Sequence, residues 1–266
     1  EDAARAQQQQ QQQHHHHHQQ QQQQQQPLQV SKLHNEIWQL SNNNLNAAED
    51  GRAEVGAILG CLTSLATSRW PKAKVELFGS RSTGLYLAES DVDVTVMGTQ
   101  LPPKEIGAAL TWMHDELARQ PWVASQQLVL SARIPVLKVI SATGLPVDVT
   151  IANSPQHTGL LARDLVLGYL SEAPQLGPLV HVFKMLLRQL GLNDPYLGGM
   201  SSYCLSVLLY NFWHESFLYN FNAVDCGYLM VGFLSAFIHR FLSNLSHVDD
   251  PLSHSFTDED GSVIMG

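Results

Sequence analysis

The sequence predicts an α+β fold in which a mixed sheet with flanking helices is followed by a mainly helical part. Short apolar segments typical of strands are confined to residues 75–151. Beyond residue 153 the apolar spacing becomes that of helices. Residues 1–30 are glutamine runs broken by a five-histidine run, and a tract this polar is expected to be disordered.

Two helices are expected ahead of the first strand, because apolar residues recur at helical spacing over residues 30–47 and 53–69. Pro71 ends the second helix and leads into a strand at 75–78. The segment 81–90 is long enough for a turn and a short helical segment, and the next strand follows at 91–97.

The remaining elements follow from the same two spacings. Pro102 and Pro103 precede an amphipathic helix at 105–119. Later strands are expected at 124–130, 134–141 and 145–151, and later helices at 160–170, 176–190, 201–214 and 224–242.

The overall charge limits how the chain could contact nucleic acid. Its 266 residues carry a formal net charge of −9, whereas a protein that relies on nonspecific phosphate contacts is usually basic. Any such contact must be local, metal-mediated or assisted by a partner. Three scattered cysteines suit a reducing compartment, and the most apolar late segment, 227–242, is too short to span a bilayer. We therefore expect a soluble intracellular protein without membrane contact.

Two aspartates stand in the strand expected at 91–97. Asp91 and Asp93 are two residues apart, so their side chains share one face and lie about 7 Å apart along the strand. Carboxylates this close repel unless a cation lies between them, and two Mg²⁺ ions ~3.5–4 Å apart would fit. Asp148 stands inside another apolar strand, where a carboxylate is costly unless it is paired or bound to metal.

A glycine and a serine follow the strand at 75–78. Gly79 allows close backbone approach, and the Ser80 hydroxyl lies beside the amides of the following turn, so the two could hold a phosphate oxygen. With metal-binding aspartates opposite, this pattern favours in-line nucleotidyl transfer, in which a 3′-hydroxyl attacks an α-phosphate and pyrophosphate leaves. The combination is more specific than a lone aspartate pair, which is usually surface charge.

Together these residues resemble the signature of the polymerase-β-like nucleotidyltransferase superfamily, with Phe78-Gly79-Ser80 followed by Asp91, Asp93 and Asp148. The surrounding sequence is similar to the TRAMP-type poly(A) polymerases and their relatives, the terminal uridylyltransferases. The similarity covers residues 37–266, and its further matches are ARIPVLKV, VDVTIAN, TGLLARDLVLGYL and PLVHVFKMLLRQLGLNDPYLGGMSSYCLSVLL.

The resemblance implies a palm domain at 49–153 and a helical central domain made of 31–48 and 154–266, with the nucleotide held in the cleft between them. We expect the helical domain to be incomplete at its C-terminal end. The implied cofactors are two Mg²⁺ or Mn²⁺ ions, and the implied substrates are an RNA 3′ end and ATP, or UTP in the uridylyl-specific relatives. A zinc-knuckle partner that supplies RNA contacts is implied as well. The implied location is the nucleus, with the cytoplasm as the alternative.

The resemblance also implies roles for the residues of the signature. Asp91 and Asp93 would bind the metals, while Asp148 would bind the catalytic metal and act on the RNA 3′-hydroxyl. Gly79 and Ser80 would contact the triphosphate.

Five further residues receive roles from the same resemblance. Asn153 would lie near the ribose, Lys184 and Arg188 would neutralise the leaving pyrophosphate, Ser202 would donate to a phosphate, and Tyr203 would stack on the base. The spacing of Lys184 and Arg188 puts both on one helix face. By pattern alone, Lys184 is equally typical of a snorkelling surface lysine, Arg188 of a solvated helix face, and Tyr203 of a core residue.

Three other functions remain open from the sequence. Terminal uridylyl transfer is the alternative within RNA enzymes, and the histidines at 247 and 254 lie near the region where uridylyl-specific relatives carry a base-reading histidine. A catalytically silent RNA- or protein-binding scaffold is the alternative of another class. Small-molecule nucleotidyltransferases share the Gly-Ser and paired-aspartate pattern but lack the segment GGMSSY.

Overall fold

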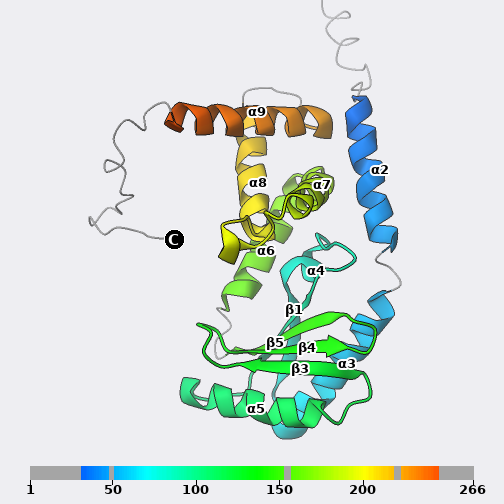
Figure 1. Cartoon of the computed structure of the whole chain (residues 1–266), viewed down its shortest axis with the longest axis vertical. Coiled ribbons are helices and arrows are strands. Elements are labelled where there is room, and N and C mark those ends of the chain that lie inside the picture. The colour runs from blue at the N-terminus through cyan, green and yellow to red at the C-terminus, as the bar shows by residue number, and fades with distance from the viewer. Residues whose placement is uncertain (1–30, 48–50, 153–156, 219–222, 246–266) are drawn as a thin grey trace, which may run out of the picture.

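The computed structural model describes residues 31–47, 51–152, 157–218 and 223–245. Within these ranges a five-stranded sheet with its flanking helices forms one part of the molecule, and a group of helices forms the other (Figure 1). No helix among the described residues combines the length and apolar character needed to cross a bilayer.

The sheet has the strand order β1-β2-β5-β4-β3, so its neighbours differ from the order along the chain. β2 and β5 are parallel, and the other three pairs are antiparallel. This mixed sheet is the one expected from the sequence. Its strands are β1 (Lys74–Phe78), β2 (Val92–Met97), β3 (Val123–Val129), β4 (Val136–Ser141) and β5 (Pro146–Ile151).

Two helices cover one face of the sheet. They are α3 (Gly51–Arg69) and α5 (Ile106–Leu117), which follows the 3₁₀ turn η1 (Pro103–Glu105). In Figure 1 both helices lie on the side of the sheet away from the helical part. Because side chains alternate along a strand, one set from the central strands points at these helices. That set is fully buried and apolar, and includes Val92, Val94, Val96, Leu137, Val139, Val147 and Val149.

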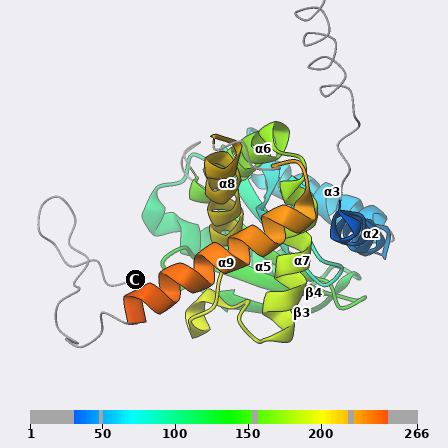
Figure 2. The same ribbon diagram turned by 90° about the horizontal axis from the view of Figure 1, so that it is seen from above.

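The second part contains α2 (Lys32–Ala47), α6 (Thr158–Glu172), α7 (Leu176–Gln189), the 3₁₀ turn η2 (Pro195–Leu197), α8 (Ser202–Leu218) and α9 (Cys226–Leu245). Figures 1 and 2 show α9 running across α8. These helices share a separate hydrophobic cluster around Leu176, Leu179, Leu205 and Leu209. The domain boundaries expected from the sequence stay a prediction.

The start of α2 is held against α9 by one buried carboxylate. Asp225, which is fully buried, precedes α9 and accepts hydrogen bonds from the backbone amides of Gly227 (2.7 Å) and Tyr228 (3.1 Å), as an N-terminal capping residue does. The same carboxylate accepts from the Ser31 hydroxyl (2.7 Å) and the Ser31 amide. Helix α2, although it comes first in the chain, thus belongs with the late helices.

One histidine joins both parts of the molecule. The ring of His181 on α7 lies between the Ser41 hydroxyl of α2 (2.7 Å from Nδ1) and the Gly84 carbonyl that follows α4 (3.0 Å from Nε2). A carbonyl can only accept, so Nε2 carries the proton and Nδ1 accepts from Ser41. Burial lowers the pKa of His181 to about 4. The histidine is therefore neutral and satisfied at neutral pH.

One strand boundary corrects an expectation about the site. β2 begins at Val92, so Asp91 lies just before the strand and not within it. The last β1–β2 pair joins Phe78 and Asp93, because the chain turns away at Gly79 and leaves Asp91 with no β1 partner. Asp91 is therefore positioned by the end of a loop. β4 likewise starts two residues later than expected, after Pro135, which has no amide to donate to the ladder.

Candidate active site

The chain turns from β1 into the short helix α4 (Gly79–Thr83) at a residue that must be glycine. Gly79 has a φ of 66°, a left-handed conformation that side chains disfavour. A Cβ there would also stand 2.0 Å from Oδ2 of Asp93. The backbone of the bend therefore lies directly against the Asp93 carboxylate.

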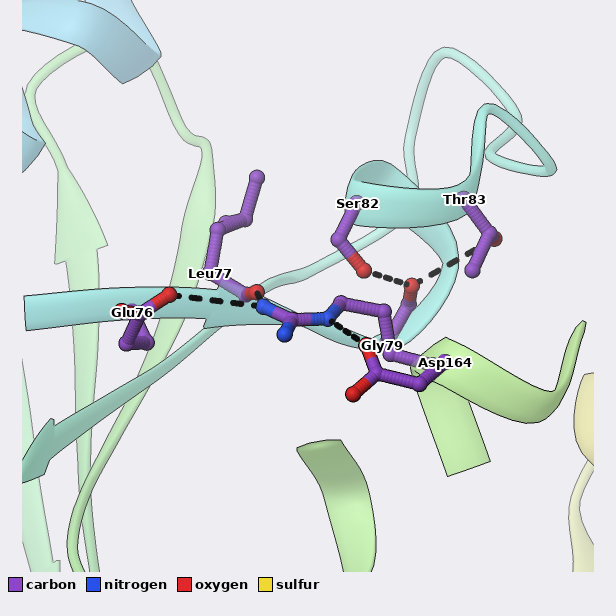
Figure 3. Close-up of polar contacts among 7 residues, drawn as sticks. Glu76, Leu77, Gly79, Ser82, Thr83 and Asp164 are labelled. Atoms are coloured by element: carbon purple, nitrogen blue, oxygen red, sulfur yellow. Dashed lines mark hydrogen bonds and ion pairs between the residues drawn. The ribbon is translucent and has the colours of Figure 1, made fainter. Parts of the chain in front are cut away.

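Contacts from both sides hold this bend (Figure 3). The Gly79 carbonyl accepts a hydrogen bond from the Ser82 hydroxyl (2.8 Å) and a longer one from Thr83 (3.5 Å). From α6, the Arg163 guanidinium donates to the Leu77 carbonyl at 3.1 Å. It also pairs with Glu76 at 3.4 Å and with Asp164 at 2.8 Å. Arg163 of the helical part thus holds the last residues of β1 in place.

The sheet brings two of the predicted carboxylates side by side. Asp93 on β2 and Asp148 on β5 are direct partners in the parallel register. Both point away from the apolar face, because Val92 and Val94 on one strand, and Val147 on the other, fill that face. The carboxylates therefore lie on the side of the sheet that the helical part faces.

The charges of the three aspartates disfavour one another. Burial, together with the charges of Asp148 and Asp91, raises the pKa of Asp93 to about 6. Burial also raises the pKa of Asp91, with Asp148 again adding to the effect. The region thus holds more negative charge than its burial favours, which is the electrostatic setting that a cation would stabilise.

One basic side chain in this region was missed from the sequence. Lys138 on β4 is the register partner of Asp148, and its Nζ lies 2.8 Å from Asp148 Oδ2. This hydrogen bond raises the pKa of Lys138. One indication of this residue was present in the sequence: a lysine interrupts the otherwise mostly apolar strand at residues 136–141. It lies on the face of the sheet that also carries the aspartates.

The donor set suits a hard divalent cation, because carboxylate oxygens are the ligands that Mg²⁺ and Mn²⁺ prefer. Asp91, Asp93 and Asp148 would hold such ions. Among the described residues, however, no three acidic, histidine or cysteine side chains lie close enough to enclose a single ion. The ion pair with Lys138 explains this separation, because it directs the Asp148 carboxylate towards β4.

A cavity of about 410 Å³ lies between the sheet and the helical part. Its walls are formed by the bend after β1, the loop before β2, α7 and the start of α8. Predicted site residues that line it are Ser80, Asp91, Asp93, Lys184, Arg188 and Ser202. The fold therefore brings together residues that are more than 120 positions apart in the sequence (80 to 202).

The two basic residues of α7 differ in their partners. Lys184 donates to the Leu85 carbonyl at 2.6 Å, and burial lowers its pKa to about 8 although the charge of Asp93 acts in the opposite direction. Arg188 forms an ion pair with Glu89 of the loop before β2. Both residues line the cavity, as one face of a helix requires.

Three described residues of the predicted site do not line the cavity: Gly79, Asp148 and Tyr203. Tyr203 is 46% exposed and does not line it, so its role in stacking on a base stays a prediction. Asn153 lies outside the described residues.

Residues 33–169 match the family described as "Poly(A) RNA polymerase, mitochondrial-like, central palm domain", which is just over half of the chain. The chain belongs to this poly(A) polymerase family. Its five-stranded sheet, with α3 and α5 behind it, is the palm of such a polymerase.

Curated relatives agree with the family. The chain is 29% identical to poly(A) RNA polymerase protein 2 of Saccharomyces cerevisiae, over 65% of this chain and 30% of the yeast protein. It is 32% identical to Trf4-2 of Drosophila melanogaster, a relative described as inactive, over 68% of this chain and 44% of that protein. The chain thus spans less than half the length of either relative.

Solved structures share the fold of this polymerase palm and its helical part. The polymerase core of TRAMP, an RNA surveillance complex, superposes with a TM-score of 0.61 at 25% identity, covering 70% of this chain and 58% of that one. A structure of the Cid1 poly(U) polymerase with MgATP superposes with a TM-score of 0.58 at 20% identity, covering 67% and 55%. The second likeness establishes the fold alone.

A second residue of the polymerase palm escaped prediction. Arg81 on α4 donates to the Ser90 carbonyl through Nε (3.0 Å) and Nη2 (2.7 Å), and its guanidinium lies 5.0 Å from the ring centre of Tyr86. These contacts tie the loop before β2 back to α4. Asp91, which follows Ser90 and has no β1 partner, is positioned by this tie.

Proposed function

We propose that this chain carries the catalytic palm of an RNA 3′-end nucleotidyltransferase that adds adenylates without a template. The observation that carries the proposal is the in-register pair of Asp93 and Asp148. Beside this pair the Gly79 bend is in contact with Asp93. An acidic face set against a tight bend and a basic helix suits a nucleoside triphosphate held through its phosphates.

The residues of the chain divide the work between the two ends of the reacting phosphate. The Ser80 hydroxyl and the basic face of α7, with Lys184 and Arg188, would bind the triphosphate and neutralise the departing pyrophosphate. Asp148, on the neighbouring strand, would accept the proton of the RNA 3′-hydroxyl. Divalent cations held by the three aspartates would supply charge stabilisation at the α-phosphate when bound.

The family and a curated relative support adenylate as the added nucleotide. The family that the chain belongs to is described by its poly(A) RNA polymerases, and the yeast relative is a poly(A) RNA polymerase. The presence of all three aspartates favours activity over a catalytically silent scaffold.

The test is extension of an unstructured RNA primer with each of the four nucleoside triphosphates separately, in Mg²⁺ and in Mn²⁺. We expect ATP to be incorporated fastest, and Asp91→Ala and Asp93→Ala each to abolish extension. Asp115→Ala, which removes an exposed carboxylate from the opposite side of the sheet, is the matched control and should leave extension unchanged.

The outcomes separate the candidate functions. Preferred use of UTP would replace poly(A) synthesis by uridylyl transfer. If a folded chain, in the presence of its partner, extends RNA with neither ATP nor UTP, the scaffold function would be the remaining candidate.

We further propose that RNA reaches the site with the help of a partner, such as a zinc-knuckle protein, in the nucleus. The net charge of −9 supports the need for a partner, since phosphate contacts require basic residues. Tight binding of RNA by the isolated chain at physiological salt, measured by electrophoretic mobility, would contradict it.

A further inference from the structure

The third carboxylate of the site already has a cationic partner. Lys138 Nζ lies 2.8 Å from Asp148 Oδ2, and the two residues are register partners on adjacent strands. The side chain of Asp148 is 22% exposed and that of Lys138 is 46% exposed. The lysine can therefore leave the carboxylate for solvent without a rearrangement of the sheet.

Other basic side chains near the aspartates are engaged elsewhere. Arg81 donates to the backbone carbonyls of Ser90 and Ala88, and Lys184 donates to that of Leu85. Their charges act on Asp91 and Asp93 through space, whereas Lys138 contacts a carboxylate directly. The Lys138 ammonium thus occupies the position beside Asp148 that a metal ion bound to this carboxylate would take.

We propose that the Lys138 ammonium and a divalent cation compete for the Asp148 carboxylate, so that Lys138 is a positioning residue that sets the metal affinity of the site. The inference rests on the proposed function, because it assigns Asp148 to a metal. It adds a residue that sets how much Mg²⁺ or Mn²⁺ the site requires.

The physical basis is the charge balance on one face of the sheet. Three carboxylates repel one another, and Lys138 offsets part of that repulsion. A cation that binds Asp148 must first displace the Lys138 ammonium. While that ammonium stays bound, it neutralises one of the negative charges that would attract the cation. Removal of the lysine should therefore strengthen metal binding, whereas removal of a merely structural lysine would weaken it or leave it unchanged.

The experiment measures Mn²⁺ binding to the full chain, without nucleotide or RNA, from the electron paramagnetic resonance signal of free Mn²⁺ at low salt. Lys138→Met should bind Mn²⁺ roughly 1.5- to fivefold more tightly than the parent chain, the range expected for a partly exposed ion pair. Lys138→Arg, which keeps the charge, should bind like the parent. In the Asp148→Asn background the Lys138→Met change should have no effect.

The matched control is Lys104→Met, which changes the net charge equally but lies beyond the opposite end of β2. Unchanged or weaker binding by Lys138→Met, or an equal gain in Lys104→Met, would overturn the inference. Should circular dichroism show that Lys138→Met is unfolded, Lys138→Gln carries the same test. Mn²⁺ binding that Asp93→Asn leaves intact would instead overturn the proposed function.

Discussion

The two faces of the five-stranded sheet contain alternate residues of the same strands and differ in what they contribute. Towards α3 and α5, residues such as Val94 and Val149 are fully buried among other apolar side chains. Towards the helical part, the intervening residues Asp93 and Asp148 are ionisable and disfavour each other's charge. The first face contributes stability, and the second face stores charge repulsion that a ligand can relieve.

This difference explains how a site with an unfavourable charge balance persists. Each fully buried aliphatic side chain contributes about 1.5–3 kcal/mol. The apolar face can therefore offset the cost of partly buried carboxylates on the other side. Mutations on the two faces should consequently separate activity from stability.

The largest expected effect is that of Asp93→Asn on activity. RNA extension should fall by about a thousandfold or more, because an amide neither holds a divalent cation nor matches the charge of the carboxylate. In EDTA the free energy of unfolding should rise by about 1–2 kcal/mol, since burial and like charge no longer penalise this side chain. Primer extension and urea denaturation measure the two quantities. A loss of stability would break the comparison between the faces.

The opposite face should respond in the opposite way. Leu110→Ala removes a fully buried side chain from α5 and should lower the free energy of unfolding by about 2–5 kcal/mol. The folded fraction should keep its extension rate per molecule. Leu161→Ala on α6, where the leucine is 52% exposed, is the matched control and should change stability by about 0.5 kcal/mol or less.

Gly79→Ala tests the contact between the bend and the acidic face. The left-handed backbone should cost about 1–2 kcal/mol of stability, and the clash with Asp93 Oδ2 should add to that cost and displace the carboxylate. The rate of RNA extension should fall because the Asp93 carboxylate is displaced. Gly144→Ala separates the two contributions, because Gly144 has a φ of 90° but open space around its missing Cβ. Equal losses of activity in both variants would contradict the role assigned to the bend.

The smallest expected effect on activity concerns a buried polar group whose hydrogen bonds are satisfied. The pKa of His181 is lowered to about 4 in the folded protein, so the unfolded chain is protonated first as the pH falls. Its contribution to stability is present above pH 6.5, its ordinary pKa, and is lost progressively as the pH falls towards 4. We expect a loss of about 2 kcal/mol from this group between pH 7.5 and pH 5.

Urea denaturation at pH 7.5 and pH 5 measures this dependence. The control is His181→Gln, which should be less stable at pH 7.5 and should show a shallower fall in stability between the two values. Parallel slopes for the two proteins would show that His181 does not couple protonation to folding.

The alternation within each strand allowed much of this arrangement to be predicted. The alternation that puts Asp91 and Asp93 on one face of the strand expected at 91–97 puts Val92, Val94 and Val96 on the other, and all three valines are fully buried. Asp148 was recognised as an acid inside an apolar strand, and β5 is that strand. The start of β2 was wrong by one residue, because the strand depends on a partner that ends at Phe78.

Lys138 could not have been assigned in the same way. It lies on β4, and its partner Asp148 lies on β5 across a short turn, so the pair itself is local in sequence. Its importance depends on β2, which inserts beside β5 from more than fifty residues earlier and brings Asp93 next to Asp148. That strand order is a long-range property of the chain.

Local chemistry along the chain thus specified which segments are strands, which of their faces is apolar and which side chains could bind a cation. The strand order, the register and the approach of α7 to the acidic face were settled only when the chain folded. The physical reason is that side-chain alternation and turn residues act over a few positions. Strand pairing and helix docking are selected by the burial of surfaces that lie far apart in the sequence.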